Sequence, residues 1–278
     1  MHRVSAETIA AQLAEIKSAP DSDGSQVAGG PTLSTTLKVL SIPLGAHWLS
    51  VTPRNFVGAG VARFALNPYL AIGKTNDSLA TVGGFTDLSV ELQDGDTTDV
   101  AMDAFGTAAT GDFLYVGSSL PFRGVAVRVG TDPQNTGAVV LTVNYWNGGW
   151  TNISATDGTS GATAFDQHGS ITWTVPATWA KTSLVAAGDA TLNNVLTRAE
   201  LYWTRFEVDT ATEATWNLSQ LRALNRSTAY AELLEGQVFE QAIQSEGPGG
   251  FACVEALTDA GTANLVVNVA AARGEVFN

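Results

Sequence analysis

The sequence predicts a mainly β protein built around a β-sandwich, with further small β regions and an N-terminal helical arm. Within residues 122–129, Val125, Val127 and Val129 alternate with smaller or charged residues, a period of two that is typical of a half-buried strand. The Asn-Gly-Gly sequence at 147–149 separates two aromatic runs and predicts a hairpin. Glycine is abundant, with 28 residues, which fits a chain of many turns between short strands.

The N-terminal region, residues 1–35, is expected to be a helix followed by a flexible arm. Ile9, Leu13 and Ile16 follow the i, i+4, i+7 spacing of an amphipathic helix over 5–17, and Ser5 can serve as its N-cap. Residues 18–31 have the composition of a linker. Two interpretations stay open: an assembly arm that docks on a neighbouring subunit, or a helix that folds back on its own domain or frays.

Three β regions are expected after the arm: residues 36–110, an aromatic-rich β-sandwich over 111–216, and a C-terminal region over 217–278. Residues 219–243 have some helical spacing, but polar and glycine interruptions favour strands there. The expected strands of the first region are 36–42, 47–51, 61–66 and 88–92. Those of the second are 122–129, 139–146, 150–153, 171–176 and 201–208, and those of the third are 228–234, 237–243, 251–257 and 264–270.

Charge and composition exclude some functional classes. The net charge of −13 argues against binding to nucleic acid or to an anionic membrane, because phosphates require a basic surface. Charged residues make up only 15% of the 278, and there are four lysines, so some strand edges are expected to be covered by partners. No apolar run approaches the roughly 20 residues of a membrane span, and no signal peptide is recognised, so synthesis in a host cytoplasm is expected. The one cysteine, Cys253, lies in an apolar run and is expected to be buried and inert.

The sequence contains no recognisable catalytic or cofactor-binding motif, so an enzyme is not expected. The histidines His2, His47 and His168 stand alone, and no glycine-rich phosphate loop is present. The densest acidic cluster, Asp94, Asp96 and Asp99, could supply oxygen ligands to Ca²⁺. Its spacing does not match an EF-hand, and a solvated acidic turn is the favoured interpretation.

Three of the seven tryptophans are candidates for a binding surface. Trp146, Trp150 and Trp179 lie at or near loops, where their rings could form a platform for sugar stacking or an interface between subunits. The favoured alternative is that tryptophan rings fill the core of the sandwich or a subunit interface.

Residues 112–209 resemble a β-sandwich module of tailed-bacteriophage virion proteins, and are similar in layout to jelly-roll, galactose-binding-like and carbohydrate-binding sandwiches. The pieces that carry the resemblance are Phe113-Leu114-Tyr115-Val116-Gly117, Phe122-Arg123-Gly124-Val125, Tyr145-Trp146-Asn147-Gly148-Gly149-Trp150, Trp173-Thr174-Val175-Pro176-Ala177-Thr178-Trp179 and Tyr202-Trp203-Thr204-Arg205-Phe206. They are framework positions, so the resemblance assigns no binding residue.

The resemblance implies a structural role on a virus particle. The first hypothesis is a non-enzymatic capsid decoration protein on the capsid surface, with the major capsid protein and copies of itself as partners. The second is a carbohydrate-binding module for host adsorption, with surface glycans as its ligands. The third is a structural protein of the tail or baseplate.

Overall fold

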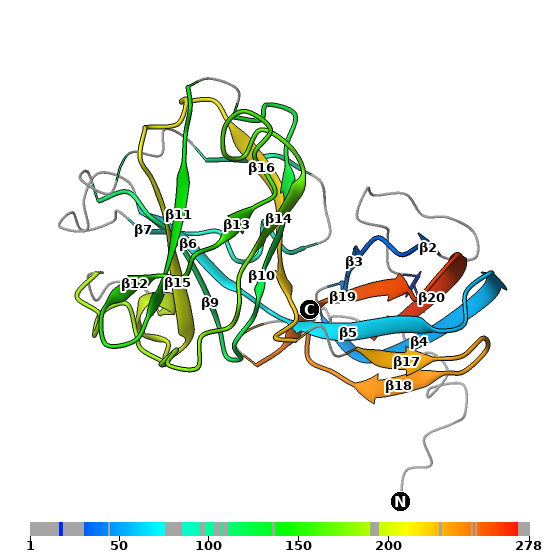
Figure 1. Ribbon diagram of the computed structural model, residues 1–278. Helices are drawn as coiled ribbons and strands as arrows, with labels where there is room; N and C mark the ends of the chain where they lie inside the picture. The colour runs from blue at the N-terminus through cyan, green and yellow to red at the C-terminus, as the bar shows by residue number, and fades with distance from the viewer. Residues whose placement is uncertain are drawn as a thin grey trace, which may run out of the picture. The chain divides into compact units, whose positions relative to one another are not determined.

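The protein is mainly β, as the sequence predicts, and its strands form four antiparallel sheets (Figure 1). The computed structural model describes residues 17–18, 31–43, 45–75, 85–94, 98–102, 107, 111–134, 137–189, 195–227, 230–245, 247 and 249–271. Over these residues the only helix is a single 3₁₀ turn, η1 (Leu196–Arg198). Within the same ranges no helix is long and apolar enough to cross a membrane.

The chain divides into two compact units. Unit 1 consists of Met1–Leu66, Ala229–Glu246 and Gly250–Asn278, and unit 2 consists of Asn67–Thr228 and Gly247–Gly249. The first predicted β region, residues 36–110, is therefore divided after Leu66. Its remaining residues belong to the same unit as the predicted aromatic-rich region, residues 111–216. Unit 1 is therefore assembled from stretches that lie far apart in the sequence.

Unit 1 contains two sheets. The β4 sheet has the order β1 (Lys17–Ser18), β20 (Thr262–Ala271), β4 (Ala46–Val57), β18 (Phe239–Ala242), and β2 (Thr32–Leu33) also pairs with β20. The β5 sheet has the order β17 (Ala231–Leu233), β5 (Ala62–Pro68), β19 (Phe251–Thr258), β3 (Lys38–Ser41). Figure 1 shows the C-terminal strands β19 and β20, in orange and red, beside the blue strands from the start of the chain.

The two sheets of unit 1 share one hydrophobic core. Leu49 and Val51 alternate along β4, and Leu265 and Val267 alternate along β20, so all four reach the same face of the sheet. Val254 of β19 meets them from the β5 sheet. Cys253, beside it, is fully buried, as expected from its apolar surroundings.

Unit 2 also contains two sheets. The β15 sheet has the order β12 (Trp150–Asn152), β11 (Leu141–Trp146), β15 (Tyr202–Val208), β9 (Leu114–Ser118), β6 (Ala71–Thr75), β7 (Phe85–Asp87). The β10 sheet has the order β13 (Thr156–Asp157), β14 (Gly169–Thr172), β10 (Gly124–Val129), β16 (Asn217–Leu224), β8 (Val100–Ala101). The predicted hairpin at the Asn-Gly-Gly sequence is present, because β11 pairs with β12 across it.

A large core of unit 2 is built from both of its sheets. Val143 and Phe206 come from the β15 sheet, and Val125 and Leu221 come from the β10 sheet. Trp173 lies among them, and its indole N–H donates to the backbone oxygen of Phe122 at 2.8 Å. The polar end of this ring is thereby satisfied inside the core, where an unpaired N–H would be costly.

Two sequence predictions are wrong in detail. Residues 88–92 form a turn, not a strand: the N–H of Leu92 donates to the oxygen of Leu88 at 3.2 Å, and both side chains are buried while Val90 is exposed. The predicted helix over 5–17 is contradicted at its end, because Lys17 lies in strand β1 and pairs with Val269. Residues 1–16 and 19–30, which hold the rest of the predicted helical arm, lie outside the described residues.

Candidate functional site

A group of interacting charged and aromatic side chains in unit 2 lies on the outer face of the β15 sheet. Phe206 and Val208 point into the large core, so Arg205 and Glu207, which alternate with them, point to the opposite face. Tyr115 of the neighbouring strand β9 lies on that same face, directly opposite Arg205. We refer to Arg205, Glu207, Asp189, Tyr115 and Asn144 as the Arg205 cluster.

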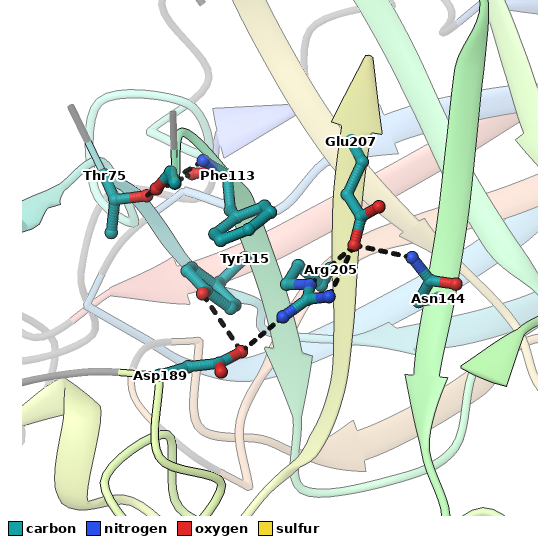
Figure 2. Close-up of polar contacts among 8 residues, drawn as sticks. Thr75, Phe113, Tyr115, Asn144, Asp189, Arg205 and Glu207 are labelled. Atoms are coloured by element: carbon teal, nitrogen blue, oxygen red, sulfur yellow. Dashed lines mark hydrogen bonds and ion pairs between the residues drawn. The ribbon is translucent and has the colours of Figure 1, made fainter. Parts of the chain in front are cut away.

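Arg205 is held by two carboxylates (Figure 2). One terminal nitrogen lies 2.9 Å from Asp189 Oδ2, while the other lies 2.6 Å from Glu207 Oε1 and Nε donates to that oxygen at 2.7 Å. Asn144 Nδ2 donates to Glu207 Oε1 at 2.7 Å, and the Tyr115 hydroxyl donates to Asp189 Oδ2 at 3.2 Å. The side chains of Arg205, Asp189 and Glu207 are only 13–16% exposed, so solvent screens these ion pairs weakly.

Aromatic rings surround the guanidinium group. Its central carbon lies 4.3 Å from the ring centroid of Phe113 and 4.8 Å from that of Trp150. Both distances are within the range of cation–π attraction, which is stronger where water is excluded. Because carboxylates and rings act on it together, the Arg205 side chain is restricted to one orientation.

Thr75 positions one of these rings. Its hydroxyl accepts the N–H of Phe113 at 2.9 Å (Figure 2). The same hydroxyl donates to the backbone oxygen of Gly111 at 3.0 Å. Thr75 closes strand β6, so this pair of bonds fixes the backbone that enters β9. The Phe113 ring is therefore held where it can lie over Arg205.

Tyr115 is a phenol that stays protonated. Burial is the main cause that raises its pKa far above the ordinary value near 10. The Asp189 carboxylate raises the pKa further, and this effect outweighs the smaller opposing effect of Arg205. A phenol in this state donates a hydrogen bond to Asp189 and is a poor nucleophile or base.

Residues 182–189 and 195–201 cover part of the same face. Thr182 and Leu201 form a bridge, and Leu184 and Leu201 pack with Trp203 in a small second core. Trp203 is fully buried and its indole N–H donates to the oxygen of Ala199 at 3.2 Å. Asp189 belongs to the first of these stretches, so its ion pair with Arg205 attaches that stretch to the sheet.

The Arg205 cluster is electrostatically satisfied. The guanidinium group binds both carboxylates, and the two carboxylates also accept from a phenol and an amide. Such an arrangement stabilises a covering segment and presents no activated nucleophile. Within the described residues, no group of three or more His, Cys, Asp or Glu side chains is placed to hold a metal ion.

The predicted Ca²⁺ residues are placed as follows. The Asp99 carboxylate accepts from the backbone N–H of Thr131 at 3.1 Å, from the Thr131 hydroxyl, and from Asn217 Nδ2 at 3.4 Å. The Asp99 carboxylate therefore links its own loop to the loop that contains Thr131. Asp94 ends a described turn, and Asp96 lies outside the described residues.

The structure brings together two of the three candidate tryptophans. Trp146 and Trp150 are opposite each other in the β11–β12 hairpin, with their ring centroids 5.4 Å apart and edge to face. Trp179 instead lies in the large core at 7% exposure, where its indole N–H donates to the oxygen of Trp203 at 3.2 Å. Its ring packs 5.2 Å from that of Phe122.

The other candidates are the arm residues Ile9, Leu13 and Ile16, which lie outside the described residues. The Arg205 cluster was not predicted from the sequence. Arg205 was visible only as part of an aromatic motif, although its alternation with Phe206 was a signal that it faces away from the core. No family model, no curated protein and no solved structure matches the chain in the comparisons with known proteins.

Proposed function

We propose that the protein is a non-enzymatic structural component of a bacteriophage virion, a capsid decoration protein that oligomerises on the head and stabilises it. The observation that carries the proposal is the role of the aromatic motifs that resemble the phage virion module. Phe122, Trp173, Trp179 and Phe206 all lie in the large core of unit 2. A resemblance in core positions is what a shared framework would produce.

The contacts between these rings support a single packed module. Trp179 lies 5.2 Å from Phe122 and 6.4 Å from Trp173, and Trp173 lies 6.3 Å from Phe206. The rings are inclined to one another in tilted or edge-to-face geometry, which is the arrangement that aromatic pairs prefer. In this proposal the two sheets of unit 2 form a β-sandwich of the jelly-roll or galactose-binding-like kind around them.

The partners in this proposal are the major capsid protein and other copies of the chain, on the capsid surface. Unit 1 supports assembly with exposed apolar side chains: Val57, Leu234 and Val238 are 69%, 53% and 55% exposed. Bonds of the Leu234–Val238 turn to Pro53 and Phe56 place this turn beside the end of β4. Neighbouring exposed apolar residues mark contact surfaces in many proteins.

The test is to locate the protein on particles. Antibodies raised against the purified chain are applied to purified phage particles that encode it, and gold-labelled particles are imaged by electron microscopy. Label on heads supports decoration, and particles made without the gene should then lose their DNA at a lower temperature and recover when the protein is added. Label on tails favours a tail or baseplate protein, and unlabelled particles that also lack the chain by mass spectrometry refute a virion role.

A carbohydrate-binding module for host adsorption is the second candidate, favoured by the Trp146–Trp150 pair. Both rings are partly exposed and belong to one hairpin, which is a common setting for stacking on a sugar face. A glycan array with the intact chain separates the two functions. Binding that disappears in Trp146→Ala but persists in Leu120→Ala, a change at a 50% exposed side chain, would favour this candidate.

A further inference from the structure

The turn of the β11–β12 hairpin contains the one Asn-Gly pair of the sequence, Asn147-Gly148. Both residues are exposed, and the strands pair on either side of them, with Trp146 opposite Trp150. The φ angle of Gly148 is +99°, which residues with a side chain rarely adopt. A Cβ atom at Gly148 would meet nothing within 4 Å. Beyond its chain neighbours, therefore, nothing crowds this glycine on the side where other residues carry a side chain.

Hydroxyl groups contact the side-chain amide of Asn147 at both of its ends. The Thr151 hydroxyl donates to Asn147 Oδ1 at 3.1 Å. Asn147 Nδ2 donates to the hydroxyl oxygen of Tyr145 at 3.3 Å. The Tyr145 hydroxyl also shares a hydrogen bond with Thr178 Oγ1 at 3.1 Å. The amide oxygen thus has a fixed donor, and the amide nitrogen lies beside a phenol.

These contacts suit one reaction, in which the next backbone nitrogen displaces the side-chain amide group. We propose that Asn147 is a site of self-modification, at which the chain converts this asparagine to aspartate and isoaspartate with the help of Thr151 and Tyr145. Water is the only co-reactant. All the residues involved belong to the β11–β12 hairpin of unit 2, so the inference does not depend on the proposed virion role.

In the first step the backbone nitrogen of Gly148 attacks Cγ of Asn147 and closes a succinimide ring. The reacting atoms belong to adjacent residues, so no distant group has to be brought to them. The proton of the Gly148 nitrogen passes to water. Negative charge develops on Oδ1 as the new bond forms, and the Thr151 hydroxyl stabilises that charge.

In the second step Nδ2 leaves. After the attack Nδ2 is an amine, and the Tyr145 hydroxyl lies next to it as a proton donor. The Cγ–Nδ2 bond breaks, its electron pair stays with the nitrogen, and ammonia departs with a proton from Tyr145, which water restores. That proton balances the one lost by Gly148. Water then opens the ring at Cγ, which gives aspartate, or at the backbone carbonyl carbon, which gives isoaspartate.

Asn152 of the same hairpin provides an internal comparison. It is exposed like Asn147, and its Oδ1 accepts the N–H of Ser154 at 2.6 Å. The residue after it is Ile153, whose side chain is branched at Cβ and obstructs the approach to its own nitrogen. Exposure is therefore shared by the two asparagines, and the following glycine distinguishes Asn147.

The modification would change the exposed aromatic pair. The rings of Trp146 and Trp150 lie with their centroids 5.4 Å apart on the two strands that this turn connects. Aspartate adds a negative charge beside them, and isoaspartate lengthens the main chain of the turn by one carbon atom. Either product also removes the Nδ2 donor from Tyr145. The reaction is thus a one-way change in the surface that the hairpin presents.

The test is mass spectrometry of the intact chain after incubation at mildly alkaline pH, with samples digested and sequenced by fragmentation over several days. Asn147 should gain the mass difference between a hydroxyl and an amino group, and the modified peptide should separate into aspartate and isoaspartate forms. Asn152 should keep its amide group. An unmodified Asn147, or equal conversion of Asn152, would overturn the proposal.

Two variants test the assisting hydroxyl groups. Thr151→Val removes the donor to Oδ1, and Thr156→Val makes the same change at an exposed threonine of β13 as the matched control. Conversion of Asn147 should be at least about threefold slower in Thr151→Val than in the control, a ratio that one hydrogen bond of ordinary strength supplies. Thr151→Ser, which keeps a hydroxyl, should restore the rate. Tyr145→Phe should also slow the reaction, and an unchanged rate in either Thr151→Val or Tyr145→Phe would overturn the proposal.

Discussion

Arg205 and Asp189, which are 16 residues apart in the chain, form an ion pair at 2.9 Å that attaches a covering segment to a sheet. Arg205 is in strand β15, whereas Asp189 directly follows a turn over residues 184–188. Side chains that are buried, charged and mutually satisfied make such an attachment specific, because any other position of the segment would leave a charge unpaired.

Arg205→Ala should destabilise unit 2 by roughly 2–4 kcal/mol, because it leaves two mostly buried carboxylates without a counter-charge. Arg63→Ala is the matched control, since it removes an exposed ion pair and should cost about 0–1 kcal/mol. Urea unfolding followed by tryptophan fluorescence measures both. Equal midpoints for the two variants would show that the Arg205 cluster contributes no more than a surface pair.

Gly117→Ala should destabilise the protein by about 1–3 kcal/mol through overpacking. A Cβ atom at Gly117 would lie 2.5 Å from the Trp203 ring, which is fully buried and cannot move aside. Gly149→Ala is the control, because a Cβ atom there meets nothing within 4 Å. Thermal unfolding is followed by the near-ultraviolet circular dichroism of tryptophan. The melting temperature should fall for Gly117→Ala and should stay at the value of the unaltered protein for Gly149→Ala. An unchanged melting temperature for Gly117→Ala would contradict the packing of Trp203 described above.

Phe206→Ala should cost about 3–5 kcal/mol, the usual loss when a buried aromatic ring is removed. Phe206 is fully buried and its ring lies 6.3 Å from that of Trp173. Leu120→Ala, at a side chain that is 50% exposed, should leave the denaturant midpoint nearly unchanged. A small effect at Phe206 would mean that the ring is accessible, and it would strengthen the case for ligand binding on this module.

The stability of unit 2 should fall as the pH decreases below about 6.5, the ordinary pKa of histidine. Partial burial, and secondly the Arg128 guanidinium group, hold the pKa of His168 below that value, and its Nδ1 accepts the N–H of Val129 at 3.2 Å. Below pH 6.5 the unfolded chain binds a proton that the folded chain does not, so this contribution is complete above 6.5 and is lost as the pH falls toward the folded pKa.

Calorimetry of His168→Gln across pH 5–8 checks this dependence. The variant keeps a hydrogen-bond acceptor but does not titrate, so its melting temperature should vary less with pH than that of the unaltered protein. His47→Gln, which changes an exposed histidine of unit 1, is the matched control. The prediction is refuted if all three proteins show the same pH profile.

The alternation of apolar residues was sufficient to predict many strands, but it failed at β16. Leu218 and Leu221 are three residues apart, which indicates a helix, yet both lie in the core of unit 2 as part of a strand. The pairing with β10 shifts between Arg128 and Val129, so β16 contains an extra residue at this point. Such a bulge changes the face to which later side chains point, and local spacing cannot reveal it.

The Arg205 cluster shows a similar limit. Strand alternation places Arg205 and Glu207 on one face, and this part could be predicted from the sequence. Asp189 lies in a segment without periodicity, and only the fold brings it to Arg205. The surface position predicted for the tryptophans is wrong in one case for another reason. Trp146 and Trp179 both lie near loops in the sequence, but only Trp179 lies in the large core of unit 2.

The interrupted path of unit 1 has a consequence for synthesis. Its strand β4 ends at Val57, but β20, which pairs with β4 over most of its length, begins only at Thr262. Ribosomes add about 5–20 residues per second, so β4 waits roughly 10–40 s for this partner. Unit 2, made almost entirely in between, can fold first. During translation the nascent chain therefore carries a folded unit 2 and an unpaired strand β4. The apolar side chains of β4 stay exposed in that interval, which makes this strand a natural site for chaperone binding.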